Sequence, residues 1–394
     1  MVQRKETQLI SLLLVVIYLS FISLGLPDSL LGAAWPSMQP LLGVPLSYAG
    51  CLSMIISFGT VLSSLFSDRL LRRFGTGLVV SCSVLLTAVA LFGYSVSGHF
   101  WMLCLFAVPY GLGAGAVDAA LNHYVATHYA SRHMSWLHCF WGVGCALSPY
   151  IMSFYLHRGD DWQGGYRAIA VLQIILTAVL FRSLPLWKRS LSADEEADAK
   201  PIPKKKLLRE RGVIQALVIF FSYCALESTA GLWASSYLVG ERGVDPQTAA
   251  RYASLFYIGI TLGRLLSGFV ADRFGDHKMT RFGLCGITCG VILLLLPLPN
   301  FCACFGLVMI GFGCAPVYPC QIHATPVLFG AERAQSMIGM QMASAYIGTT
   351  LMPPLFGVIA DHAGLRMFPL FLALFLVLMA LLTEHAGMQQ KLKK

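Results

Sequence analysis

Charged side chains are scarce in this sequence of 394 residues. Asp, Glu, Lys and Arg together make up 12% of it, and 57% of the residues are hydrophobic, whereas about a quarter of a typical soluble domain is charged. A water-soluble fold of this length needs more polar surface, so the composition excludes one. Because a membrane-spanning helix takes about 20 apolar residues, the chain has room for about a dozen such helices.

Signatures of enzymes, nucleotide binding and metal binding are also missing. No GxxxxGK[ST] segment is present, and the run Gly111-x-Gly113-x-Gly115 lies inside an apolar stretch, not in a loop after a strand. The 12 cysteines are scattered without a repeated CxxC pair, which is typical of small apolar side chains. We therefore expect no enzyme activity, no ATP-driven transport, no cofactor and no metal.

Long apolar runs separated by short polar breaks dominate the sequence. They predict twelve membrane helices at 9–35, 46–67, 76–96, 100–127, 135–156, 166–186, 212–239, 247–271, 280–297, 300–326, 334–359 and 365–385. The one long polar stretch lies between the sixth and seventh runs. We predict an all-α membrane protein with an N-terminal six-helix bundle at 1–186, a cytoplasmic linker at 187–211 and a C-terminal six-helix bundle at 212–394.

Basic residues gather in the loops on one side of the predicted membrane. That side holds both termini, the linker and most loop arginines, whereas the opposite loops hold only Arg158, Arg167, Arg242, Arg251 and Arg366. The positive-inside rule then predicts a protein of the cell membrane with both termini in the cytoplasm. The same distribution accounts for the net charge of +9 without a nucleic-acid partner. Nothing in the sequence requires more than a monomer in the lipid.

The two halves of the chain repeat one another. Three sets of residues recur at offsets of 199, 204 and 200: Asp28-Ser29 with Glu227-Ser228, Gly59 and Asp68-Arg69 with Gly263 and Asp272-Arg273, and Gly111-x-Gly113 with Gly311-x-Gly313. Because six spans separate the copies, both run in the same direction. This is the parallel repeat of six-plus-six transporters.

Three of the 19 acidic residues lie well inside predicted spans: Asp28, Asp118 and Glu227. Charged groups in a bilayer cost about 2.5 to 3.5 kcal/mol, so they are functional candidates. Arg264 is the one basic residue at a similar depth, and we expect the three acids to lack a charged partner. A carboxyl group in a poorly solvated cavity can hold a proton near neutral pH. Asp28 and Asp118 are therefore candidate proton-coupling residues, with hydroxyl binding and structural hydrogen bonding as alternatives.

Two segments near the ends of the second and eighth spans resemble the loop motif of the major facilitator superfamily. They are Ser67-Asp-Arg-Leu-Leu-Arg-Arg-Phe-Gly75 and Gly263-Arg-Leu-Leu-Ser-Gly-Phe-Val-Ala-Asp-Arg-Phe-Gly275. The resemblance implies the twelve-helix major facilitator fold over essentially the whole chain. Charge-assisted bonds from such a motif to a neighbouring helix end would latch one conformation; the alternative is a simple stop signal. The latch candidates are Asp68, Arg69, Arg72, Arg73, Asp272 and Arg273.

Three further segments resemble the fucose and glucose to proton symporters of that superfamily: Gly25-Leu-Pro-Asp-Ser-Leu-Leu-Gly-Ala-Ala-Trp-Pro-Ser37, Gly111-Leu-Gly-Ala-Gly-Ala-Val-Asp-Ala-Ala-Leu-Asn122 and Leu137-His-Cys-Phe-Trp-Gly-Val-Gly-Cys-Ala-Leu-Ser-Pro149. The resemblance implies proton-coupled sugar uptake by alternating access, with the acids at Asp28 and Asp118 handling substrate and proton. An exporter of amphiphiles by proton antiport and a solute sensor that transports nothing are the alternatives.

A neutral polyol needs many hydrogen-bonding groups and a flat apolar wall. The candidate substrate-binding residues are Trp35, Asn122, His138, Trp141, Glu227, Trp233, Tyr318, Gln321 and Gln341. The two tryptophans Trp35 and Trp233 equally fit interfacial aromatic belts, and His138 and Gln341 equally fit hydrogen bonds between helices. We also expect the prolines of the tenth span, Pro316, Pro319 and Pro326, to interrupt that helix.

Overall fold

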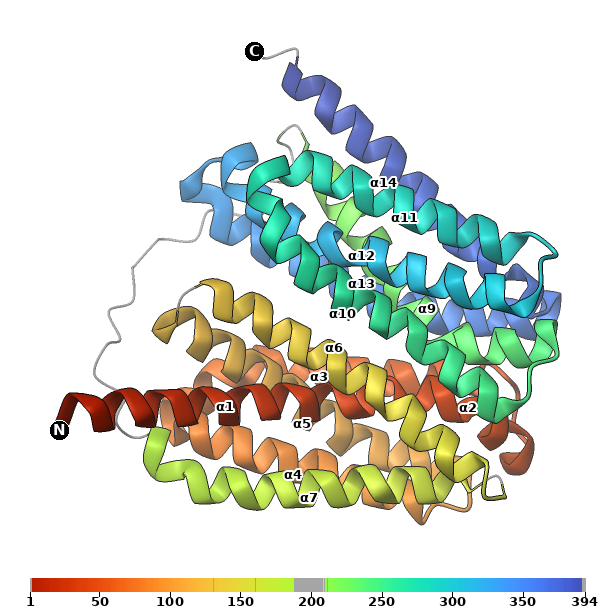
Figure 1. The fold of residues 1–394 in the computed structure, drawn as a ribbon, viewed down its shortest axis with the longest axis horizontal. Coiled ribbons are helices and arrows are strands. Elements are labelled where there is room, and N and C mark those ends of the chain that lie inside the picture. Colours follow the sequence, from red (N-terminus) through yellow and green to blue (C-terminus); the bar gives the residue numbers. More distant parts are fainter. Residues whose placement is uncertain are drawn as a thin grey trace. The chain divides into compact units, whose positions relative to one another are not determined.

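The computed structural model describes residues 2–129, 131–159, 161–187, 208, 210 and 212–391. Apart from short turns, these residues are helical (Figure 1). Twelve of the described helical segments are long and apolar enough to cross a membrane. The prediction of an all-α protein with twelve spans is confirmed, and the chain is a multi-pass membrane protein.

The helices of the first half are α1 (Val2–Asp28), α2 (Leu30–Leu42), α3 (Tyr48–Phe74), α4 (Thr76–Ser95), α5 (Phe100–His128), α6 (Ser131–Leu156) and α7 (Trp162–Trp187). Those of the second half are α9 (Val213–Arg242), α10 (Pro246–Phe274), α11 (Asp276–Leu295), α12 (Asn300–Phe329), α13 (Ala331–Ala363), the short 3₁₀ helix η2 (Leu365–Met367) and α14 (Phe368–Lys391). The first span combines α1 with α2, and the last combines η2 with α14.

Prolines affect the spans differently from what the sequence predicts. The first span runs to Leu42 instead of ending near residue 35, and its second helix, α2, continues through Pro36 and Pro40. The expected interruption of the tenth span is wrong, since α12 continues through its three prolines. Membrane helices tolerate proline where neighbouring groups satisfy the carbonyl that the ring displaces, so proline alone does not mark a break.

The interruption occurs in the first span. Its helix α1 ends at Asp28, directly after Pro27. Ser29 separates α1 from α2 with φ −94° and ψ −6°, and its hydroxyl donates to the carbonyl oxygen of Cys145 in α6 at 2.7 Å. The turn thereby gains a bond to a neighbouring helix. It also places a carboxylate at the end of a helix in the middle of a membrane span.

Contacts divide the chain into two compact units. The first comprises Met1–Pro45, Cys51–Glu196 and Pro246–Ser254, and the second comprises Leu46–Gly50, Ala197–Asp245 and Leu255–Lys394. In the first unit, α1 packs against α6, and α4 packs against α5 and α7 (Figure 1). The second unit repeats these pairings, with α9 against α13 and α11 against α12 and α14. The expected linker 187–211 lies almost wholly outside the described residues.

Glycines reproduce the repeat at the level of single backbone contacts. A Cβ atom at Gly111 in α5 would lie 2.2 Å from the carbonyl oxygen of Ile56 in α3. The counterpart in the second unit is Gly311 in α12, where a Cβ atom would lie 1.9 Å from the carbonyl oxygen of Phe256 in α10. Gly111 and Gly311 are 200 residues apart, and so are the residues they contact, Ile56 and Phe256. The parallel repeat predicted from the sequence is therefore a repeat of packing.

A second glycine contact also occurs in both units. A Cβ atom at Gly144 in α6 would lie 2.1 Å from the carbonyl oxygen of Ile22 in α1. Its counterpart is Gly348 in α13, where a Cβ atom would lie 2.5 Å from the carbonyl oxygen of Phe221 in α9. Only glycine allows the two helices of each pair to approach this closely.

Candidate functional site

The carboxylate of Asp28 meets the side chain of Trp141. Its Oδ2 atom accepts a hydrogen bond of 2.8 Å from the indole N–H of Trp141 in α6. Hydrogen bonds to ionised groups are about twice as strong as bonds between neutral groups. The structure thus brings one predicted proton-coupling residue together with one predicted substrate-binding residue.

A glycine beside this pair allows the close approach. A Cβ atom at Gly25 in α1 would lie 2.1 Å from the carbonyl oxygen of Trp141, a separation that real Cβ atoms do not adopt. Together with the contact at Gly144, this sets the spacing of α1 and α6 next to the bond. The distance between Asp28 and Trp141 is therefore fixed by backbone packing as well as by the bond itself.

Asp118 and Asn122 form a second pair, within α5. The Asn122 side chain donates from Nδ2 to Oδ1 of Asp118 at 2.8 Å and to the backbone oxygen of Asp118 at 3.0 Å. On the same helix, a Cβ atom at Gly115 would lie 2.2 Å from the carbonyl oxygen of Thr60 in α3. The glycines therefore bring α3 close, as the sequence predicts, and both polar side chains remain partly buried.

The two membrane-embedded acids of the first unit, Asp28 and Asp118, both accept hydrogen bonds from neutral N–H donors. The ion pairs formed among the described residues include neither Asp28 nor Asp118. Within the described part of the chain, an N–H donor and not a cation therefore faces each carboxylate.

Glu227 does have a charged partner, which corrects the expectation from the sequence. Nη2 of Arg264 in α10 lies 3.6 Å from Oε1 of Glu227 in α9, and the two side chains are 15% and 19% exposed, respectively. The sequence placed Arg264 inside a span but did not indicate that α9 and α10 bring these residues together. Oε1 of Glu227 accepts no hydrogen bond from the described residues. This acid therefore differs from the other two in being balanced by a cation.

Two predicted substrate-binding tryptophans lie in the interior of the protein. Trp35 in α2 and Trp233 in α9 are both 0% exposed. The indole N–H of Trp233 donates to the carbonyl oxygen of Pro353 at 2.9 Å, and its ring packs edge-on against Phe356. In this structure neither ring presents a free face, so a substrate-binding role for Trp35 and Trp233 stays a prediction. Both rings fill space between helices.

The remaining aromatic candidates are half-buried. His138, which shares a face of α6 with Trp141, packs edge-on against Phe21 in α1 at 5.9 Å between ring centroids. In α12, Tyr318 donates its hydroxyl to Sδ of Met342 at 3.4 Å. These contacts pack His138 and Tyr318 against neighbouring residues but leave both side chains partly exposed. A substrate-binding role for either residue stays a prediction.

Gln341 connects two helices of the second unit. It is 1% exposed, and its Oε1 accepts a hydrogen bond of 3.0 Å from Thr325 of α12. The same hydroxyl also bonds to the backbone oxygen of Gln321. Gln341 was a candidate for substrate binding or for a hydrogen bond between helices, and these contacts favour the hydrogen bond between helices. The side chain of Gln321 is partly exposed.

The latch candidates are described only in part. The side chains of Asp68 and Asp272 lie outside the described residues. The basic members of the set are all exposed: Arg69, Arg72, Arg73 and Arg273. The latch therefore stays a prediction.

Known proteins of similar sequence include several transporters. The chain is 23% identical to Bypass of stop codon protein 6 of Saccharomyces cerevisiae, over 95% of this chain and 82% of that protein. It is 22% identical to the cis,cis-muconate transport protein of Acinetobacter baylyi, over 80% and 79% of the two chains. It is 20% identical to the glucose/mannose transporter GlcP of Bacillus subtilis, over 78% of each.

Solved structures share the fold. The nucleoside transporter NupG superposes with a TM-score of 0.76 at 14% identity, covering 94% of this chain and 98% of that one. A D-xylose-proton symporter gives a TM-score of 0.74 at 12% identity, covering 94% and 96%. The sequence model of the Major Facilitator Superfamily matches residues 17–300 and 215–386. The chain therefore belongs to the Major Facilitator Superfamily.

Proposed function

We propose that this protein takes up a sugar or a similar small polar solute together with protons. Transport would proceed by alternating access of two six-helix bundles, 1–186 and 212–394, joined by the linker 187–211. The observation that carries the proposal is the pair of membrane-embedded acids in the first unit, Asp28 and Asp118, each bonded to a neutral N–H donor.

A neutral donor leaves a carboxyl group free to exchange its proton. A cation beside the acid would favour permanent ionisation, whereas an N–H donor stabilises the charge and still permits protonation. Opening the site to water on the cytoplasmic side would release the proton. At a potential of 100 mV, worth about 2.3 kcal/mol per charge, one proton can drive about 50-fold accumulation of a neutral solute.

The acids also bear on the class of solute. Asp28, Asp118 and Asn122 offer acceptors and donors to hydroxyl groups, and the Trp141 ring offers an apolar face. An anionic solute would meet two carboxylates of its own sign in the first unit. A neutral polyol fits this chemistry better than an organic acid does. The Acinetobacter baylyi relative is named for such an acid, cis,cis-muconate. Glu227 is the proposed contact in the second unit.

The distribution of basic loops supports an orientation with both termini in the cytoplasm. The protein would then reside in the cell membrane, and a monomer suffices for alternating access. Protease protection of an epitope at each terminus in right-side-out vesicles tests this orientation. Both epitopes should be protected.

A thermal-shift screen followed by flux measurement tests the function. Sugars, nucleosides and organic acids are screened with purified protein, because a ligand that binds the folded state raises its Tm. The stabilising compounds are then added to liposomes that contain a pH-sensitive dye. We expect a sugar to stabilise the protein and to cause proton entry. Proton exit would indicate an exporter, binding without flux would indicate a sensor, and stabilisation by organic acids alone would overturn the sugar assignment.

A further inference from the structure

Pro27 leaves one carbonyl of the first span without its usual helical donor. Proline has no N–H group, and its ring displaces the carbonyl four residues earlier, which is that of Ser23. An unpaired carbonyl inside a membrane is costly, because no water replaces the missing bond. This carbonyl therefore needs a donor from another helix.

Gln173 of α7 supplies that donor. Its Nε2 donates to the carbonyl oxygen of Ser23 at 2.7 Å, and its Oε1 accepts a hydrogen bond from the Ser23 hydroxyl. The Gln173 side chain is 1% exposed. A buried amide is tolerated when both of its ends are bonded, and here both bonds go to one residue at the proline.

Asp28 lies on the other side of the same proline. It is the last residue of α1, and its carboxylate bonds to Trp141 of α6. The hydroxyl of Ser29 then bonds to the backbone of α6. Thus α7 holds the chain before Pro27, and α6 holds the chain after it.

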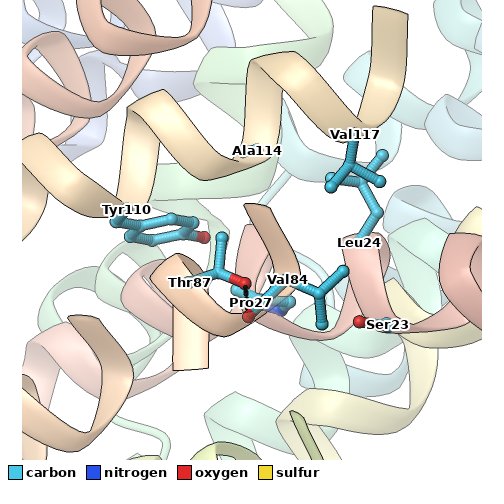
Figure 2. A pocket seen from close by; sticks show the side chains of 8 residues that line it. All are labelled: Ser23, Leu24, Pro27, Val84, Thr87, Tyr110, Ala114 and Val117. Atoms are coloured by element: carbon cyan, nitrogen blue, oxygen red, sulfur yellow. Dashed lines mark hydrogen bonds between the residues drawn. The ribbon is translucent and has the colours of Figure 1, made fainter. Parts of the chain in front are cut away.

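A small cavity borders the interruption on a third side. Ser23, Leu24 and Pro27 form its wall in α1, opposite Thr87 of α4 and Tyr110 of α5 (Figure 2). It has room for about one water molecule. Close packing holds backbone positions in a protein interior, and where it leaves this space the hydrogen bonds from α6 and α7 hold the first span.

We propose that Gln173 is a positioning residue for Asp28. By bonding the carbonyl that Pro27 leaves free, it holds the first span in place just before its interruption and so presents the Asp28 carboxylate to Trp141. The importance of Gln173 for proton coupling rests on the proposed function. Its effect on the geometry of Asp28 is independent of that function.

The test follows the indole N–H signal of Trp141 by NMR in full-length protein labelled with ¹⁵N-tryptophan. Trp141→Phe identifies the signal among those of the 7 tryptophans. Gln173→Met keeps the length of the side chain and removes both bonds, so the signal should move upfield as the carboxylate acceptor is lost. An unchanged signal overturns the proposal.

Thr177→Val is the matched control. Thr177 is buried one turn further along α7, and its hydroxyl bonds to the backbone of its own helix at 2.8 Å. The Trp141 signal should stay in place in this variant. An equal movement in Thr177→Val and Gln173→Met would show a general packing effect and overturn the proposal. If Gln173→Met does not fold, Gln173→Leu takes its place, because a leucine side chain likewise cannot donate to the Ser23 carbonyl.

Pro27→Ala provides an independent check. It restores an N–H group that can bond the Ser23 carbonyl, so Gln173→Met should lower the Tm much less in this background than in the native sequence. Equal losses in the two backgrounds would overturn the proposal. Neither readout requires a transported solute. A failure of the proposed function would therefore be seen separately, as absent proton entry in liposomes with the NMR shift retained.

Discussion

Asn122 donates to the carboxylate of Asp118 from one turn further along the same helix, at 2.8 Å. Because both residues belong to α5, their bond survives movements between helices. The bond from Trp141 to Asp28 joins two helices instead. A movement of α1 against α6 would therefore change the surroundings of Asp28 while Asp118 kept its partner. Under the proposed function, this difference would allow the two acids to act at different stages of the transport cycle.

Asp118→Asn should abolish accumulation against a gradient while leaving counterflow exchange at least partly intact. The amide cannot carry a proton, but it can still bond to Asn122 and to hydroxyl groups. Uptake and counterflow of the sugar found by the thermal-shift screen measure both activities in liposomes. Asp161→Asn, in an exposed loop position, is the control and should retain accumulation. Equal loss of accumulation and counterflow would contradict a proton-carrying role for Asp118.

Trp141→Phe should reduce solute-dependent proton entry by about tenfold or more. The substitution keeps an aromatic ring but removes the donor to Asp28, and a hydrogen bond to a charged group contributes about 1.5 to 3 kcal/mol. Initial rates in dye-loaded liposomes measure the effect. Trp136→Phe is the matched control, since Trp136 lies on the same helix but is 42% exposed. Similar losses in both variants would argue against a specific role for the bond to Asp28.

Glu227→Gln should destabilise the protein by about 3 kcal/mol, because it leaves the partly buried Arg264 guanidinium without its carboxylate. Replacing both residues by Leu should cost much less than the sum of the single replacements. Unfolding in detergent measures each variant. The exposed pair of Arg281 and Glu384, at 2.9 Å, is the control, and Glu384→Gln should change stability by less than about 1 kcal/mol. Additive effects of the two Leu replacements would show that Glu227 and Arg264 are not coupled.

Gly111→Ala and Gly311→Ala should both lower the Tm, and by similar amounts. Each added methyl group would overlap a backbone carbonyl oxygen, so two helices would have to separate. Gly268→Ala is the control, because a Cβ atom there has no neighbour within 4 Å. It should leave the Tm unchanged or raise it slightly, since alanine favours helix over glycine. A large effect in only one of the two repeat positions would contradict equivalent packing.

Patterns within single helices were predictable from the sequence. The spans follow from apolar runs, and the shared face of Gly111, Gly115, Asp118 and Asn122 follows from the helical period. The glycine repeat also predicted packing, because a small residue at such a position has one main use in a membrane helix. These features need no knowledge of which helices are neighbours.

Features that join different helices were not predictable. The pairing of Glu227 with Arg264 depends on α9 and α10 being adjacent. The interruption after Asp28 depends on Pro27 together with donors from α6 and α7, whereas the three prolines of α12 leave that helix continuous. Proline supplies only a displaced carbonyl, and the neighbouring helices determine whether the helix breaks.

The repeated glycine contacts also bear on how the protein evolved. They indicate duplication of one six-helix unit, and the contacts of Ile22 and Phe221 align Asp28 with Glu227 at an offset of 199. The two copies share this packing, whereas the chemistry beside the two acids differs. Asp28 is bonded to a neutral donor, and Glu227 lies beside the cation of Arg264. Replacing Arg264 by an uncharged residue would make the two copies alike in this respect.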